Sequence, residues 1–113
     1  MNEADKIRLR HMLDAAHHAQ AFVHGRSRID LDTDQQLTFA LTRAIEIIGE
    51  AAAQVSTGCR GAYPGIPWTA IVGMRNRLIH AYFDVDHDRL WATVKHALPD
   101  LIAQIEAMLA TGE

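Results

Sequence analysis

The sequence is short of cysteine and proline and has no long hydrophobic stretch. Cys59 is the only cysteine among 113 residues, which excludes an internal disulfide and a metal cluster built from cysteines. No apolar run approaches the roughly 20 residues that cross a bilayer, and residues 1–10 are too charged for the apolar part of a signal peptide. We therefore expect a cytoplasmic protein with no membrane partner.

Positive charge is not in excess. Lysine and arginine number 11 against 14 aspartates and glutamates, a net charge of -3, whereas a protein that coats nucleic acid would be strongly basic. A local basic cleft remains possible, because phosphate binding needs a patch of positive charge and not a positive net charge of the whole chain. The 49% of hydrophobic residues and the length are those of one globular unit, so residues 1–113 are predicted to form a single domain.

The scarcity of proline, with only three residues, and the many alanines and leucines favour helix over strand. Apolar residues recur at helical spacing in segments that predict four helices, over about 3–24, 34–56, 67–83 and 87–109. Gly25 is expected to end the first helix. Helices joined by short links predict an all-α protein, an up-and-down four-helix bundle.

The links and one proline refine this prediction. Asp32 or Thr33 is expected to cap the second helix, and Asp84 or Asp86 the fourth. Residues 57–67 contain three glycines and two prolines, which predicts a loop. Proline inside a helix removes a hydrogen bond and crowds the preceding turn, so Pro99 should kink the last helix or split it in two.

The third predicted helix contains an arginine in an unexpected place. At about 100° per residue, its apolar residues form one broad arc, with Arg75 in the middle of it. A guanidinium there needs a partner. Arg75 could pair with a carboxylate of the second helix, Glu46 or Glu50, which share a side of that helix with Arg43. It could also line a cleft that receives an anion, or lie at a subunit interface.

The neighbours of Arg75 are polar. Asn76 and His80 are four residues apart and would share a helix face, whereas Arg75 and His80 are five apart, roughly 140° around the axis. Both could act on one phosphate only if the helix is distorted or a second subunit contributes. His80 could equally be a solvated side chain, since the chain has seven histidines.

The segment 75–82, Arg-Asn-Arg-Leu-Ile-His-Ala-Tyr, resembles the signature of the HEPN ribonucleases: Arg, a polar residue, three further positions, His, any residue and Tyr. The flanking sequence is similar to the HepT-like branch of that family at residues 66–68, 73–74, 83–86, 43–51 and Trp91. The similarity extends from about Leu37 to Ile105. The spacing between Arg and His alone would not identify this family, but together with the similar flanking segments it does so specifically.

This resemblance implies a homodimer whose paired motifs face a shared cleft and cleave RNA without a metal or any other cofactor. His80 would transfer protons, as suits a side chain that titrates near neutral pH. Arg75 would bind the scissile phosphate, and Asn76 would orient His80 or donate to the phosphate. Arg43 and Arg77 would add RNA contacts. The products would be a 2′,3′-cyclic phosphate or phosphate end and a 5′-hydroxyl.

The resemblance also implies a partner protein. Similar chains are toxins whose antitoxin, a minimal nucleotidyltransferase, attaches AMP to the motif tyrosine, here Tyr82. The added negative charge would repel RNA and occupy the anion site beside Arg75. Tyr82 is seven positions after Arg75, which would place the two residues within about 20° of each other on one helix. By itself Tyr82 could equally be a core tyrosine with its hydroxyl satisfied.

Two other functions compete with the ribonuclease. The chain could be a non-catalytic HEPN module that binds a nucleotide or a partner nucleotidyltransferase, or a structural bundle in which Arg75 is ion-paired. The intact set of Arg75, Asn76, His80 and Tyr82 favours the enzyme. The histidines of the first helix lack a recognised metal-binding pattern and are predicted to be solvated, and the alternating aspartates at 84, 86 and 88 are predicted to serve in helix capping.

Overall fold

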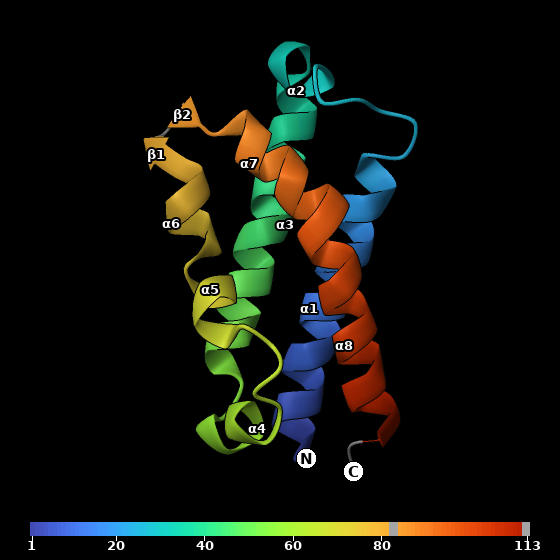
Figure 1. Cartoon of the computed structure of the whole chain (residues 1–113), viewed down its shortest axis with the longest axis vertical. Coiled ribbons are helices and arrows are strands. Elements are labelled where there is room, and N and C mark those ends of the chain that lie inside the picture. Colours follow the sequence, from blue (N-terminus) through green and yellow to red (C-terminus); the bar gives the residue numbers. More distant parts are fainter. Residues whose placement is uncertain (82–83, 112–113) are drawn as a thin grey trace.

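In the computed structural model, which describes residues 1–81 and 84–111, the chain is all-α apart from one short hairpin (Figure 1). The elements in order are α1 (Glu3–Phe22), α2 (Asp30–Thr33), α3 (Gln35–Gln54), α4 (Thr57–Ala62), α5 (Trp68–Val72), α6 (Met74–Leu78), β1 (Ile79–Ala81), β2 (Asp84–Val85), α7 (His87–Ala92), the π-helical turn η1 (Thr93–Ala97) and α8 (Leu98–Thr111). The all-α prediction is confirmed.

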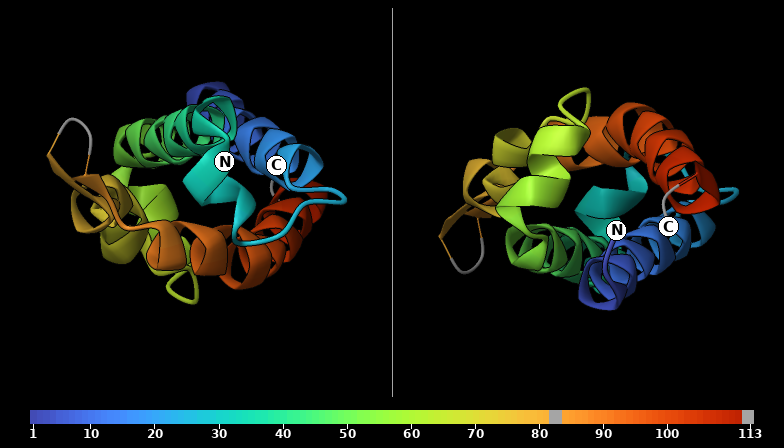
Figure 2. Two further views of the ribbon diagram at one scale, coloured as in Figure 1. Left: turned by 90° about the horizontal axis from the view of Figure 1, so that it is seen from above. Right: turned by 90° about the horizontal axis from the view of Figure 1, so that it is seen from below.

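The long segments run alternately up and down the molecule (Figure 1). The helix α1 packs along α3 and also contacts α8, while α5 and α6 lie against α3. Seen along the long axis, the helices surround a common centre, which α2 covers at one end (Figure 2). Both chain termini lie at the opposite end (Figure 1).

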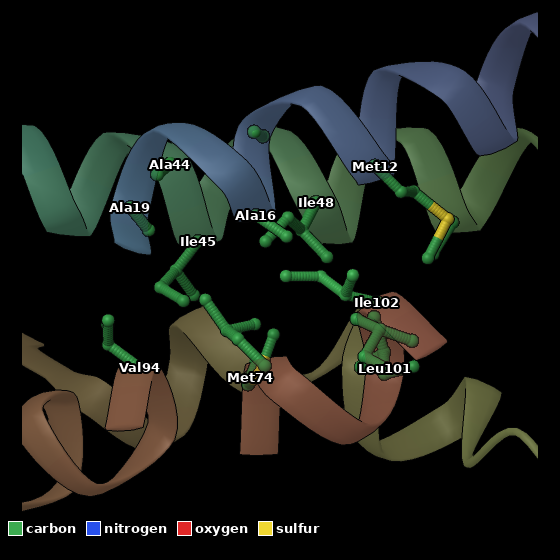
Figure 3. Close-up of a cluster of buried hydrophobic side chains, with 14 of the residues drawn as sticks. Met12, Ala16, Ala19, Ala44, Ile45, Ile48, Met74, Val94, Leu101 and Ile102 are labelled. Atoms are coloured by element: carbon green, nitrogen blue, oxygen red, sulfur yellow. The ribbon is translucent and has the colours of Figure 1, made fainter. Parts of the chain in front are cut away.

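The core lies between the α1–α3 layer and the layer formed by α5, α6, η1 and α8 (Figure 3). Its most completely buried large side chains are Leu9, Met12, Leu41, Ile45, Ile48, Leu90, Leu98 and Ile105. Burial of each such side chain contributes about 1.5–3 kcal/mol. Among the apolar residues of α1, Leu9 and Met12 are fully buried, whereas Ile7 and Phe22 are 46% and 42% exposed.

Helix ends are set mainly by aspartate, asparagine and glycine. Asn2 caps α1 by accepting a hydrogen bond from Asp5 N at 2.7 Å, and Gly25 follows that helix with a positive φ of 72°, which suits glycine. Asp86 caps α7 as predicted. The cap of α3 is Asp34, not Asp32 or Thr33, because residues 30–33 form the extra helix α2.

The segment predicted as a loop after α3 contains the short helix α4. Ser56 caps it, accepting from Cys59 N at 3.2 Å. The buried carboxylate of Asp5 on α1 accepts from Ser56 N at 2.8 Å and from Ser56 Oγ at 2.7 Å. A polar cap and a tertiary contact therefore outweigh the glycines that predicted a loop.

The prediction of one continuous third helix over 67–83 is wrong. The helix breaks at Gly73 and ends at Leu78, and a strand follows directly. Ile79 pairs with Val85 in the antiparallel hairpin, and Asp86 N donates to the carbonyl of Leu78 at 2.8 Å. Pairing with a segment that lies further along the chain gives these backbone groups partners outside a helix.

The predicted disturbance by Pro99 in the last helix is confirmed and takes the form of a π-helical turn. Leu98 N–H donates to the carbonyl of Thr93, five residues back. Proline lacks an N–H and crowds the carbonyl four residues before it, here that of Lys95, and the wider turn accommodates this change. Within residues 1–81 and 84–111, no helix combines the length and apolar character needed to cross a membrane.

Candidate functional site

The short helix α6 presents the three polar residues of the motif. Arg75, Asn76 and Arg77 are exposed, whereas Met74 and Leu78 face the core. The prediction that Arg75 lies in the middle of a buried arc is wrong, since its side chain is 54% exposed. That arc assumed one helical phase from Trp68 onward, and the break at Gly73 resets the phase.

An acidic side chain of α3 holds one edge of Arg75. Arg75 Nε lies 3.4 Å from Glu46 Oε1, so the pairing with Glu46 that the sequence left open is observed. Glu46 Oε2 also lies 3.4 Å from Arg43 Nη1, which is 3.4 Å from Glu50 Oε1. Pairs this exposed contribute little to stability. Because Glu46 contacts Arg75 at Nε, the two Nη groups form the end of the guanidinium that could bind an anion.

Gly49 sets the distance between α3 and the segment that leads to Arg75. A Cβ at position 49 would lie 3.3 Å from the carbonyl oxygen of Ile71 and 3.5 Å from that of Val72. The backbone of α5 therefore approaches α3 so closely at Gly49 that a side chain larger than hydrogen would require the neighbouring backbone to shift. This close approach positions α6, and with it Arg75, against Glu46.

Arg77 lies on the other side of α6. It is two residues from Arg75, about 200° around a helix, and its Nη2 donates to the carbonyl of Ala70 at 2.6 Å. This bond ties α6 to the end of α5 across Gly73. Arg77 also borders a cavity of about 400 Å³ between α5–α6 and η1–α8. The structure thus brings Arg43 and Arg75 together around Glu46 but does not add Arg77 to them.

His80 lies in β1, directly after the helix that carries Arg75 and Asn76. Of the two conditions for joint action of Arg75 and His80, a departure from regular helix is the one observed. The side chain of His80 and the whole of Tyr82 lie outside the described part of the chain. The expectation that Arg75 and Tyr82 share a helix face therefore also lies outside the described residues; the helix that carries Arg75 ends at Leu78.

A second polar cluster, which the sequence did not reveal, joins α2 to the start of α7. Asp32 Oδ1 lies 2.7 Å from His87 Nδ1 and accepts from Arg28 Nη1 at 2.9 Å. Arg28 Nε donates to Asp88 Oδ1 at 2.6 Å. The hydrogen bond from His87, followed by that from Arg28, lowers the pKa of Asp32.

No spacing rule could have found this cluster, because its partners are 55 and 60 residues apart. The prediction that the aspartates at 84, 86 and 88 serve in capping holds for Asp86, whereas Asp88 pairs with Arg28. The histidines at 11, 17, 18 and 24 are exposed, as predicted. Among the described residues no three His, Cys, Asp or Glu side chains gather as metal ligands.

Comparison with known proteins gives a consistent result. Residues 12–108 match the family described as Ribonuclease HepT-like. The "Probable ribonuclease HepT" of Thermococcus cleftensis is 43% identical over 70% of this chain and 72% of its own length. An RNase candidate of Caldanaerobacter subterraneus subsp. tengcongensis is 37% identical over 89% of this chain and 90% of its own.

A further RNase candidate, from Methanocaldococcus jannaschii, is 34% identical over 84% of this chain and 87% of its own. No solved structure matches the chain. The family match covers the helix with Arg75, the strand with His80 and the acidic stretch of α3, and it agrees with the resemblance found in the sequence. The chain belongs to the HepT-like ribonuclease family.

Proposed function

We propose that the chain is an endoribonuclease that needs no metal or cofactor, and that it is the toxin of a toxin–antitoxin pair. The observation that carries this proposal is the half-exposed guanidinium of Arg75, held by Glu46 at Nε only, on the helix that leads directly into the strand with His80. Membership of the HepT-like family and the names of the relatives support it.

The reaction is an internal transfer of phosphate. The ribose 2′-oxygen attacks phosphorus, the bond from phosphorus to the 5′-oxygen breaks, and the products are a 2′,3′-cyclic phosphate and a 5′-hydroxyl. One group must take the proton of the 2′-hydroxyl and another must give a proton to the leaving oxygen, which is the role of His80. Arg75 stabilises the charge on the phosphate through its Nη groups, and Asn76 donates to the phosphate or orients His80.

Two proton transfers and one motif histidine per chain favour a site shared between two copies. In a homodimer, one His80 acts as base while the other acts as acid. Arg43, beside Glu46, and Arg77, on the far side of α6, contact the RNA strand on either side of the scissile phosphate. The permanent charge of arginine takes the place that a metal ion has in other nucleases.

Control of this activity is assigned to Tyr82. A nucleotidyltransferase antitoxin would transfer AMP from ATP, with the tyrosine oxygen attacking the α-phosphorus, pyrophosphate leaving and the hydroxyl proton released to solvent. Because Tyr82 is only seven positions from Arg75 in the sequence, we expect the added phosphate to reach the anion site of Arg75. Its negative charge repels RNA and can occupy that site.

Expression with and without the neighbouring gene tests the proposal. The wild-type chain alone should arrest growth, and Arg75→Ala and His80→Ala should not. The purified wild type should cleave RNA in the presence of EDTA and leave a cyclic phosphate end. Growth and RNA left unharmed by all three chains would instead favour a non-catalytic HEPN module that binds a nucleotide or the nucleotidyltransferase. Protein made together with its neighbour should carry AMP on Tyr82 by mass spectrometry.

A further inference from the structure

A cavity of about 280 Å³ lies between α2, the start of α3 and the junction of β2 with α7. Its walls include Asp32, Gln35, Phe39, Val85 and His87. These elements meet at the end of the bundle that carries the hairpin (Figures 1 and 2). We propose that this cavity binds one base of a single-stranded RNA substrate next to the cleaved bond, an inference that rests on the proposed ribonuclease function.

The hairpin that carries His80 forms one wall of the cavity. Val85 lines it and pairs with Ile79, the residue before His80. Asp86 N, the next backbone donor, bonds to the carbonyl of Leu78 at the end of α6. A base in the cavity therefore contacts the strand that pairs with β1, and these backbone contacts connect the cavity to the segment that carries the motif.

Phe39 supplies a stacking surface. Its side chain is 51% exposed at the cavity, an unfavourable position for a large apolar ring unless something covers it. Proteins that bind single-stranded RNA place unstacked bases on aromatic rings of this kind. The apolar side chains of Leu31 and Val85 complete a surface that suits the faces of a planar base.

The cavity and the proposed phosphate site lie along the same helix, α3, which contributes Phe39 to the cavity and Glu46 to the contact with Arg75. Phe39, Arg43 and Glu46 lie within about 60° of one another around that helix and span roughly 10 Å of its length. Arg43 contacts Glu46, which contacts Arg75. An RNA strand that lays a base on Phe39 therefore passes Arg43 on its way to Arg75, with positive charge facing its phosphates.

The polar wall can read the edge of the base. Asp32, whose pKa is lowered by His87 and Arg28, is ionised and can only accept hydrogen bonds, so His87 must donate from Nδ1. With Nδ1 as the donor, a ring without a proton on Nε2 would present that atom as an acceptor for an N–H of the base. The amide of Gln35, at the same cavity, can both donate and accept.

Short RNAs with an abasic site at successive positions around the cleaved bond test the proposal. For the wild type, one position should lower kcat/KM about 10-fold, the usual scale of base stacking. Phe39→Ala should lose about the same factor on intact RNA and become insensitive to the abasic site at that position. Phe39→Trp should keep both the activity and the sensitivity.

Phe22→Ala is the matched control, since it removes another exposed ring, 42% exposed, that lies on α1 away from this cavity. It should leave the abasic pattern unchanged. The same RNAs, bound without cleavage by His80→Ala, should show the same single position in their affinities. Loss of all cleavage by the wild type would end the ribonuclease proposal, whereas this binding pattern tests the cavity separately.

Asp32→Asn tests the reading of the base edge. An amide can donate to Nδ1, which would turn Nε2 into a donor, so the preferred base at the sensitive position should change. An unchanged preference would show that His87 does not read the base. Equal abasic sensitivity of wild type and Phe39→Ala would overturn the proposal. So would a dimer that dissociates in Phe39→Ala, because a second copy of the chain would then be the group that covers this ring.

Discussion

At the scale of single residues, Glu46 has the most specific role in the candidate site. It is 24% exposed and contacts Arg75 Nε and Arg43 Nη1, each at 3.4 Å. Its carboxylate fixes the direction of the Arg75 guanidinium and partly neutralises it. Orientation of a charged group toward a transition state contributes more to the rate than to substrate affinity.

We therefore expect Glu46→Ala to lower kcat about 10-fold or more, with a smaller change in KM. Glu46→Gln, which keeps a hydrogen-bonding oxygen near Nε, should lie between that variant and the wild type. Glu50→Ala is the control, since Glu50 is paired with Arg43, whereas the ion pair of Arg75 is with Glu46. Steady-state kinetics on one RNA would check this, and a rise in KM alone would contradict an orienting role.

Asp5 is a residue whose contribution belongs to stability. Its buried carboxylate, 3% exposed, accepts two hydrogen bonds from Ser56 and so ties α1 to the corner between α3 and α4. Asp5→Ala should lower the free energy of unfolding by about 1–3 kcal/mol, because buried donors lose their partner. Urea denaturation would measure this. Glu3→Ala, at an exposed position of the same helix, should change stability by less than about 0.5 kcal/mol.

At the scale of elements, local signals predicted what depends on local sequence. The helices around Leu9, Leu41 and Ile105 follow from apolar residues at helical spacing, and the capping role of Asp86 from its place before a helix. The third segment has the same spacing but a different structure. Its break at Gly73 and its strand at Ile79 depend on contacts with α3 and with Val85, which helical periodicity within one segment cannot report.

The approach of α5 to α3 at Gly49 leads to a prediction about this element. Alanine in a helix is favoured over glycine by roughly 0.5–1 kcal/mol, but here the new Cβ must push back the carbonyl of Ile71. Gly49→Ala should therefore change stability little, while the displacement of α5 and α6 moves Arg75 and lowers kcat. Gly58→Ala, where a Cβ meets nothing within 4 Å, should stabilise the protein without affecting the rate.

The short helix α2 is held by charge and should respond to acid. The pKa of Asp30 is lowered by the backbone N–H of Ser27, that of Asp32 by His87, and that of Asp34 by Arg26. A lowered pKa in the folded state contributes stability that is present above the ordinary aspartate pKa of about 3.9. That stability is lost as the pH falls through the lower folded value.

Unfolding measured from pH 5 down to pH 2 should thus show a steeper loss of stability in the wild type than in Asp32→Asn. Replacement of Asp32 removes the charge that is protonated in this range. Asp14→Asn, on the exposed side of α1, serves as the control and should follow the wild-type curve. Identical curves for wild type and Asp32→Asn would show that the contacts of Asp32 with Arg28 and His87 do not stabilise the fold.

At the scale of the whole molecule, the bundle places the residues of interest on its surface and not in a closed pocket. Arg43, Arg75 and Asn76 are exposed, and the molecule measures only 44 × 28 × 20 Å. The sequence alone predicted which residues form the motif and that Glu46 could pair with Arg75. It could not predict how open they are, because exposure depends on how the helices pack.

An open site of this kind, with one motif histidine per chain, predicts that a second copy completes it. Arg75→Ala and His80→Ala should each lose about 10²–10⁴-fold in activity as pure proteins. After the wild type is mixed with His80→Ala, exchange of subunits would form heterodimers whose shared cleft holds only one His80 and therefore lacks either the base or the acid. Activity should then follow the fraction of wild-type homodimer measured by native mass spectrometry, and not the fraction of wild-type chains. Since a site contained in one chain keeps its activity beside an inactive copy, activity proportional to the fraction of wild-type chains would contradict the shared site.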